Sequence, residues 1–166
     1  PNATDETGRA ILLFDPSKQD NTKYDRATLV RAIWYVVHAA LADSSNNGHK
    51  KGVLFMGIGR NLKFNQFDRQ QVKMNADSIK GCLPIRVSAF YFCHPPAFFH
   101  VIFPVVKLFI GPLLRKRIRV QAGSDSKVLE SLESSGIPRE SVPVELGGDY
   151  VFDHLEWLQE RMEAGL

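Results

Sequence analysis

Cys93 and His94 are adjacent in the sequence and are the residue types of a thiol nucleophile and its general base. They end an apolar stretch that predicts a strand, and neighbouring residues of a strand point to opposite faces of its sheet. A thiol nucleophile needs a base within hydrogen-bonding reach, so these two side chains do not activate each other. We interpret Cys93 as a buried structural cysteine. Together with Cys82 it favours a pair of reduced thiols in a cytoplasmic protein, with a disulfide between them as the alternative.

Other motifs for catalysis or metal binding are incomplete or missing from the sequence. Gly57-Ile58-Gly59 follows a predicted strand, but Leu62 stands where a dinucleotide-binding fingerprint requires its third glycine. The sequence has no phosphate-binding Gly-Lys-Ser/Thr loop and no Gly-x-Ser-x-Gly nucleophile elbow. The histidines lack metal-ligand spacing, and we interpret His100 as a core histidine. We therefore expect no enzyme activity, no metal and no cofactor.

The strongest positive signal is an apolar segment at residues 97–114, which predicts one helix with a kink near Pro104. Two sets of apolar residues recur on opposite sides of this helix: Phe99, Phe103, Val106 and Ile110 on one, and Phe98, Ile102, Val105 and Phe109 on the other. A helix that is hydrophobic all round is buried on both sides or contacts something apolar besides water. The uninterrupted apolar run in this segment is shorter than the roughly 18–20 residues that a membrane-spanning helix needs. A central core helix and a lid over a hydrophobic ligand both remain open.

A basic run follows this helix, consisting of Arg115, Lys116, Arg117 and Arg119. Nucleic-acid binding is disfavoured because the run has no accompanying aromatic platform and the formal net charge of the chain is only +3. A solvated charged face and a contact with anionic lipid headgroups remain as alternatives.

Strands and helices alternate along the chain. Apolar stretches at residues 10–14, 52–58, 85–93 and 117–121 predict strands, and helices are predicted at 26–42, 66–80, 97–114, 124–135 and 150–162. Such alternation predicts an α/β fold with a mainly parallel sheet layered with helices, in a single domain at residues 1–166.

Four segments, in this order, resemble the lipid-binding domain of the CRAL-TRIO (Sec14-like) family. Asp5-Glu6-Thr7-Gly8-Arg9 is similar to the D-x-x-G-R that precedes the first strand of the family, and residues 51–59 are similar to its second strand. Leu83-Pro84-Ile85-Arg86 is similar to its tyrosine-proline-x-arginine segment, and residues 142–148 to its closing leucine-proline-x-glutamate-leucine-glycine-glycine.

The resemblance implies a three-layer α/β/α sandwich whose sheet is the floor of an apolar pocket closed by a gate helix. It also implies noncatalytic binding, with transfer or sensing, of a phospholipid or other small hydrophobic molecule. The residues that we expect to line the pocket are Ile85, Val87, Ala89 and Tyr91 on one face of the third strand, Phe99, Phe103, Val106 and Ile110 on the gate helix, and Arg117 beside the headgroup. The residues that we expect to face a membrane during transient peripheral contact are Phe98, Ile102, Phe109, Arg115 and Lys116.

The chain departs from the family pattern at several positions. Gly57 follows Met56 where the family has an aspartate, and His94 replaces the asparagine before the gate helix. Ile85 and Arg117 stand where phosphatidylinositol-binding members carry a glutamate and a lysine, which predicts a weak preference for that lipid. The helical domain that precedes this one in the family is absent from the sequence given. The missing family residues leave a protein-interaction module with a collapsed pocket as an alternative, and a hydrolase is disfavoured by the missing nucleophile motif.

Overall fold

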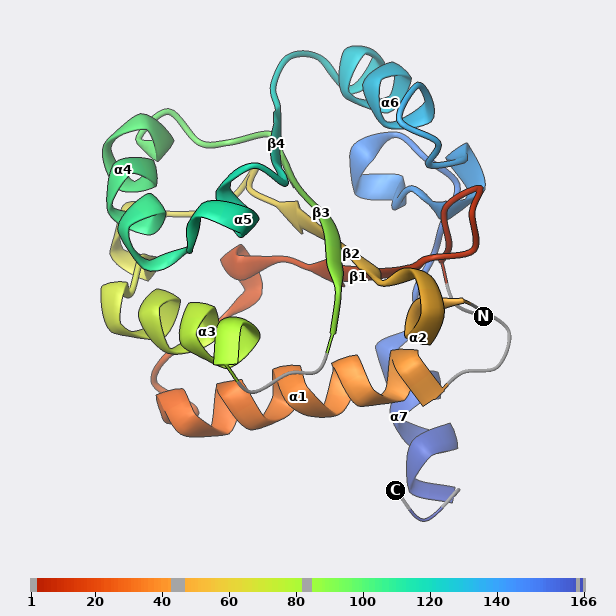
Figure 1. The fold of residues 1–166 in the computed structure, drawn as a ribbon, viewed down its shortest axis with the longest axis horizontal. Coiled ribbons are helices and arrows are strands. Elements are labelled where there is room, and N and C mark those ends of the chain that lie inside the picture. The colour runs from red at the N-terminus through yellow and green to blue at the C-terminus, as the bar shows by residue number, and fades with distance from the viewer. Residues whose placement is uncertain (1–2, 43–46, 82–84, 164, 166) are drawn as a thin grey trace.

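The computed structural model describes residues 3–42, 47–81, 85–163 and 165, and its centre is a four-stranded parallel sheet (Figure 1). The strands lie side by side in chain order: β1 (Ala10–Phe14), β2 (Val53–Ile58), β3 (Val87–Cys93) and β4 (Ile118–Gln121). All six residues of β2 are buried, as expected for a strand covered on both faces. The predicted parallel sheet is confirmed, with strand starts shifted by at most two residues.

The helices follow the predicted alternation. They are α1 (Arg26–Ala42), α2 (Gly48–Lys51), α3 (Arg69–Gly81), α4 (Phe99–Phe109), α5 (Pro112–Arg115), α6 (Asp125–Glu133) and α7 (His154–Glu163), with short 3-10 turns η1 (Pro16–Lys18), η2 (Phe64–Gln66), η3 (Arg139–Ser141) and η4 (Val144–Leu146). The expectation of one helix at residues 97–114 is wrong. The backbone of Gly111 is extended, and Pro112, which suits the first position of a helix, begins α5.

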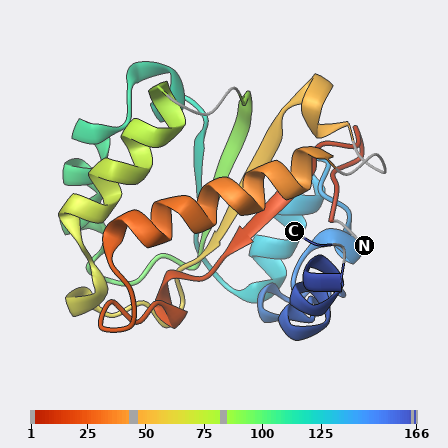
Figure 2. The same ribbon diagram turned by 90° about the horizontal axis from the view of Figure 1, so that it is seen from below.

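Helices cover both faces of the sheet, which confirms the three-layer α/β/α arrangement (Figure 2). Consecutive neighbouring strands joined by right-handed crossovers place their connecting helices on one face. On that face Val37 of α1 packs against Leu12 and Phe55. On the opposite face Leu132 of α6 belongs to the same buried cluster as Leu54.

The end of the chain returns to the β1 edge of the sheet. After α6, buried Ile137, Val142 and Leu146 join the core on the α6 side. Further along, α7 reaches α1, where the ring centroids of Trp157 and Tyr35 are 6.1 Å apart. The edge strand β1 is therefore flanked by α1 and by the C-terminal segment (Figure 1).

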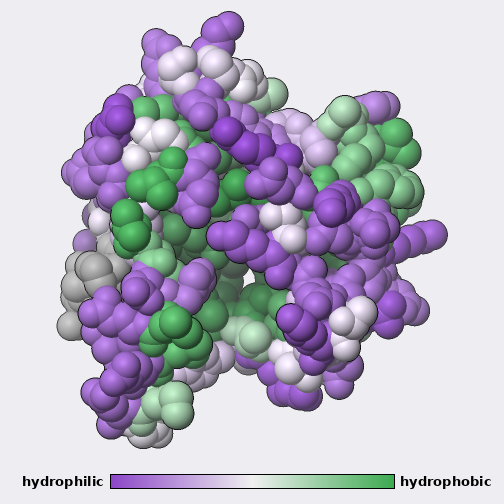
Figure 3. Space-filling view, turned by 180° about the vertical axis from the view of Figure 1, so that it is seen from behind, coloured by the Kyte–Doolittle hydropathy of each residue, from purple (hydrophilic) through white to green (hydrophobic). Residues whose placement is uncertain are grey.

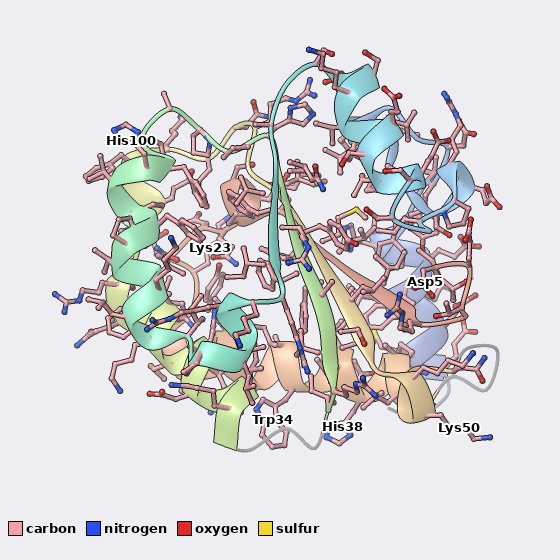
Figure 4. All side chains as sticks on the ribbon, turned by 45° about the horizontal axis from the view of Figure 1, so that its top comes forward. Asp5, Lys23, Trp34, His38, Lys50 and His100 are labelled. Carbon is pink, nitrogen blue, oxygen red and sulfur yellow. The ribbon has the colours of Figure 1, made fainter. Side chains whose placement is uncertain are left out.

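Asp5 organises the loop before β1 and is only 4% exposed (Figure 4). Its carboxylate accepts hydrogen bonds from the backbone N–H of Thr7 and Arg9 and from Nε of Arg9 at 2.6 Å. The positive φ of Gly8, 78°, closes the loop in a conformation that favours glycine. Burial raises the pKa of Asp5, but the hydrogen bonds from Arg9 and Thr7 outweigh it and hold the pKa below its ordinary value.

Candidate functional site

The residues of β3 that were expected to line one pocket lie on two faces of the sheet. Val53 pairs with Val87, but the next residue, Leu54, pairs with Ala89, so Ser88 is an extra residue in β3. Such a bulge shifts the alternation of side chains. Val87 packs with the core on the α1 side, whereas Ala89 and Tyr91 belong with the core on the α6 side. The expectation that these side chains share a face is therefore wrong.

Ile85 joins Val87 on the α1 side, where it is half-buried. Leu83, Pro84 and Cys82 lie outside the described residues.

An aromatic stack connects the sheet to α4. The ring of Phe92 on β3 stacks on Phe99 with centroids 4.8 Å apart, and Phe99 stacks on Phe103 at the same distance. A Cβ at Gly59 would lie 2.8 Å from the Phe92 ring, so glycine at this position leaves room for the base of the stack. Phe99 and Phe103 thus lie on the side of α4 that faces β3. Lys107 places its ammonium 4.4 Å from the centre of the Phe103 ring.

The side of α4 that was expected to face a membrane is partly internal. Ile102 is only 5% exposed, which contradicts its predicted position. Phe98 and Phe109 are half-buried: Phe98 meets the Phe64 ring edge-on, and the guanidinium of Arg69 on α3 lies over Phe109. The physical reason is that α4 packs beside α3 as well as against Phe92 of β3, so more of its circumference is covered.

The exposed apolar residues of this region are different ones. Val101 and Leu108 of α4 are 55% and 69% exposed, and Leu113 of α5 is 73% exposed. Arg115, the last residue of α5, and Lys116 are exposed, as expected.

His100 lies on the outer side of α4, which corrects its interpretation as a core histidine (Figure 4). Its Nδ1 is 2.6 Å from the carbonyl oxygen of Ala97, a contact at the start of the helix.

The remaining predicted ligand residues lie nearby. Val106 and Ile110 are half-buried on α4 and just beyond it. Arg117 precedes β4 and donates a hydrogen bond from Nη1 to the carbonyl oxygen of Val87. The guanidinium is thereby held against the backbone of β3.

A charged cluster lies at the carboxyl end of the sheet, where β3 leads toward α4. His94 has a φ of 51°, in the left-handed region, and its Nε2 lies 2.9 Å from Nη2 of Arg60 and 3.2 Å from Oδ1 of Asp125. Arg60 and Asp125 also form an ion pair. Burial and then the charge of Arg60 lower the pKa of His94, which favours the neutral ring, and Nε2 accepts a hydrogen bond from the guanidinium of Arg60. The cluster ties the ends of three strands together just before α4.

Cys93 does not take part in this cluster. Its side chain is fully buried in the core on the α6 side, and burial raises the pKa of its thiol to about 12. Its interpretation as a buried structural cysteine is confirmed.

An open cavity of about 650 Å³ lies at the β1 edge, away from α4. It is lined by β1, by the C-terminal half of α1 and by parts of residues 143–161. Seen from behind, this face of the molecule is hollowed and the hollow has hydrophobic walls (Figure 3). None of the predicted ligand residues is among the residues that line it. Two features of the sequence could have indicated this cavity: the small residues Ala39 and Ala40, and the aromatic residues that follow Gly148.

The described residues include no group of three His, Cys, Asp or Glu side chains placed to hold a metal ion. Within the same parts of the chain, each helix is too short or too polar to span a bilayer.

Comparison with known proteins places this fold and its motifs in one family. The CRAL/TRIO domain model matches residues 2–148. Human tyrosine-protein phosphatase non-receptor type 9 is 24% identical over 156 residues, which are 94% of this chain and 25% of that protein. Rat clavesin-2 is 24% identical over 147 residues, covering 87% of this chain and 43% of that protein. The chain therefore spans less than half the length of these relatives.

The crystal structure of Sfh5 shares the fold, with a TM-score of 0.61 and 16% identity over 75% of this chain and 49% of that one. The resemblance seen in the sequence is confirmed by the family match: the chain belongs to the CRAL/TRIO domain family.

Proposed function

We propose that this chain binds a lipid or another small hydrophobic molecule without covalent chemistry, and that it transfers or senses that molecule. Membership of the CRAL/TRIO family supports lipid binding or transfer at the level of the family. The observation that carries the proposal for this chain is the position of α4. Its inner aromatic residues stack on the sheet through Phe92, while Val101 and Leu108 remain exposed on its outer side.

The proposed ligand pocket lies between α4 and the α1-side face of the sheet. Val87 and Ile85 would form part of its floor, and Phe99, Phe103 and the following half-buried residues of α4 its lid. Ala89 and Tyr91 are not part of this proposal because they face α6. Entry of a ligand requires the Phe92–Phe99 stack to separate. Burial of an acyl chain offsets that loss by about 0.8 kcal/mol for each methylene.

We expect a weak preference for phosphatidylinositol. Ile85 offers no carboxylate to an inositol hydroxyl, and Arg117 donates to the carbonyl oxygen of Val87. A headgroup phosphate would have to compete with that internal hydrogen bond.

Transient membrane contact is the second part of the proposal, together with a cytoplasmic location. The exposed side chains of Val101, Leu108 and Leu113 would enter the lipid interface, and Arg115 and Lys116 would lie near the headgroups. Each basic residue near an anionic surface contributes about 1 kcal/mol.

The test is transfer of a fluorescent phosphatidylcholine between vesicles that contain phosphatidylserine. We expect Arg115→Glu with Lys116→Glu to slow transfer at low salt and to leave bound lipid in place. Lys50→Glu with Lys127→Glu changes the net charge equally at exposed positions outside α4 and α5, and should have little effect. Raised salt should reduce the difference, because charge attraction is screened over about 10 Å at 0.1 M. Absence of transfer by the unaltered chain would contradict the proposal.

A protein-interaction module with a closed pocket is the alternative, and one observation favours it. Phe14 fills the space over Gly57, where a Cβ would come within 2.3 Å of its ring, and Phe14 also contacts Phe90. A face that is already filled by aromatic rings would hold no ligand. Under this alternative the purified chain carries no lipid and takes none up from vesicles.

A further inference from the structure

The cavity at the β1 edge is separate from the region beneath α4. Of the described residues that line it, none belongs to α3, α4 or α5. It lies at the edge of the sheet, since β2 is the one strand of the described residues that pairs with β1. A ligand in this cavity would therefore contact different side chains from a ligand beneath α4.

Small residues on α1 create the space. Ala39 and Ala40 line the cavity from α1, and the edge strand β1 contributes residues from both faces of the sheet, among them Ile11 and Leu13 on the α6 side. Aromatic residues of the C-terminal segment form another wall, in which Phe152 contacts Trp157 with ring centroids 6.1 Å apart. The volume of about 650 Å³ falls within the roughly 300–1,000 Å³ of ordinary ligand sites.

Arg161 gives the cavity one specific polar feature. Its Nε is buried and has no hydrogen-bond partner among the residues that the structure describes. The guanidinium lies against the rings of Tyr35 and Trp157, at 6.0 and 5.9 Å from their centres. A buried donor without a partner is unfavourable, and a ligand atom that accepts from it removes that cost.

The charges around the cavity argue for a neutral ligand. Nζ of Lys18 lies 3.9 Å from Oδ2 of Asp15 and 3.8 Å from Oε1 of Glu145, so its charge is shared between two carboxylates. Glu160 lines the cavity as well, next to Arg161. Three carboxylates against two cations would repel an anion, whereas an uncharged oxygen can accept from Arg161 without that repulsion.

We propose that the β1-edge cavity is a second ligand site, which binds a neutral, mainly apolar molecule through one carbonyl, ester or hydroxyl oxygen. That oxygen accepts a hydrogen bond from Nε of Arg161, and the apolar body lies against Ala39, Ile11 and Trp157. Binding here goes beyond the lipid site proposed beneath α4 and does not depend on opening that helix.

The fluorescence of Trp157 reports occupancy of this site directly. The chain has two tryptophans, and Trp34 lies outside the cavity lining, where its Nε1 donates to Ser78. Trp34→Phe therefore leaves Trp157 as the single reporter. Titration of this variant with 2-octanone should shift the Trp157 emission saturably, and octanoate, with the same chain length and a negative charge, should bind more weakly.

Four substitutions in the Trp34→Phe background locate the binding. Ala39→Phe should abolish the response by filling the cavity, whereas Ala32→Phe, at an exposed position of the same helix, should not. Arg161→Met should weaken 2-octanone binding about tenfold, as expected from loss of one hydrogen bond. Val87→Phe, which alters the face beneath α4, should leave the response unchanged.

Thermal unfolding checks that each variant is folded. If Ala39→Phe does not fold, Val36→Phe fills the same cavity from a half-exposed position. The proposal is overturned if 2-octanone gives no saturable response, if a folded filling variant responds fully, or if Arg161→Met binds 2-octanone as tightly as its parent. None of these outcomes bears on lipid binding beneath α4.

Discussion

Val87 and Ala89 are two residues apart on β3, yet their side chains lie on opposite faces of the sheet because Ser88 is bulged out of the pairing with β2. Substitution of either residue by phenylalanine should overpack the core and cost roughly 1–3 kcal/mol of stability. Only Val87→Phe should also reduce bound lipid, since Ala89→Phe acts on the side of α6. Lipid extraction and urea unfolding measure the two effects. Equal loss of lipid in both variants would place the ligand elsewhere.

The exposed apolar residues of α4 and α5 should contribute to membrane binding and have little effect on the stability of the fold. We expect Leu108→Ser with Leu113→Ser to reduce binding to phosphatidylcholine vesicles, with a stability change within about 0.5 kcal/mol for each exposed position. Ile102→Ala is the comparison, because this buried side chain should cost roughly 2–5 kcal/mol when truncated. Vesicle flotation and urea unfolding separate the outcomes. Unchanged flotation of the double variant would show that this surface does not enter the lipid.

Asp5 should contribute stability that depends on pH. Its pKa is lowered in the folded chain, so its contribution is present above the unfolded value of about 3.9 and is lost as the pH falls through the folded pKa. Asp5→Asn should therefore cost about 1.5–3 kcal/mol near pH 7 and less near pH 3. Glu6→Gln, in the same loop but exposed, should change little. A pH-independent difference between Asp5→Asn and the parent chain would refute this role of the charge.

His94 adopts a left-handed backbone conformation that asparagine also tolerates and β-branched residues do not. We expect His94→Asn to stay close to the parent in stability, apart from its lost contact with Arg60. His94→Val should lose about 1–3 kcal/mol more. Urea unfolding of the pair provides the measurement, and equal stability of the two variants would show that the conformation carries no constraint here.

Much of the fold could be predicted from local sequence patterns. Runs such as the one in β2 are apolar on both faces, and their alternation with amphipathic helices is enough to indicate a parallel sheet between helix layers. The Asp5–Arg9 loop could be recognised because its hydrogen bonds join residues close in sequence.

The site depended on contacts that are distant in sequence. The bulge at Ser88 is a property of the pairing between β2 and β3, so period-two alternation gave Ala89 and Tyr91 the wrong face. Ile102 was placed outside because periodicity along α4 does not reveal that α3 lies beside it. The β1-edge cavity combines α1 with a segment more than a hundred residues later, which no local pattern connects.

The most direct test of the central claim is native mass spectrometry of the purified chain, followed by lipid extraction. We expect a population carrying one hydrophobic molecule, lost on denaturation and reduced in Val87→Phe. Detection of the chain at its unliganded mass alone, together with no uptake of lipid from phosphatidylcholine vesicles, would contradict the account.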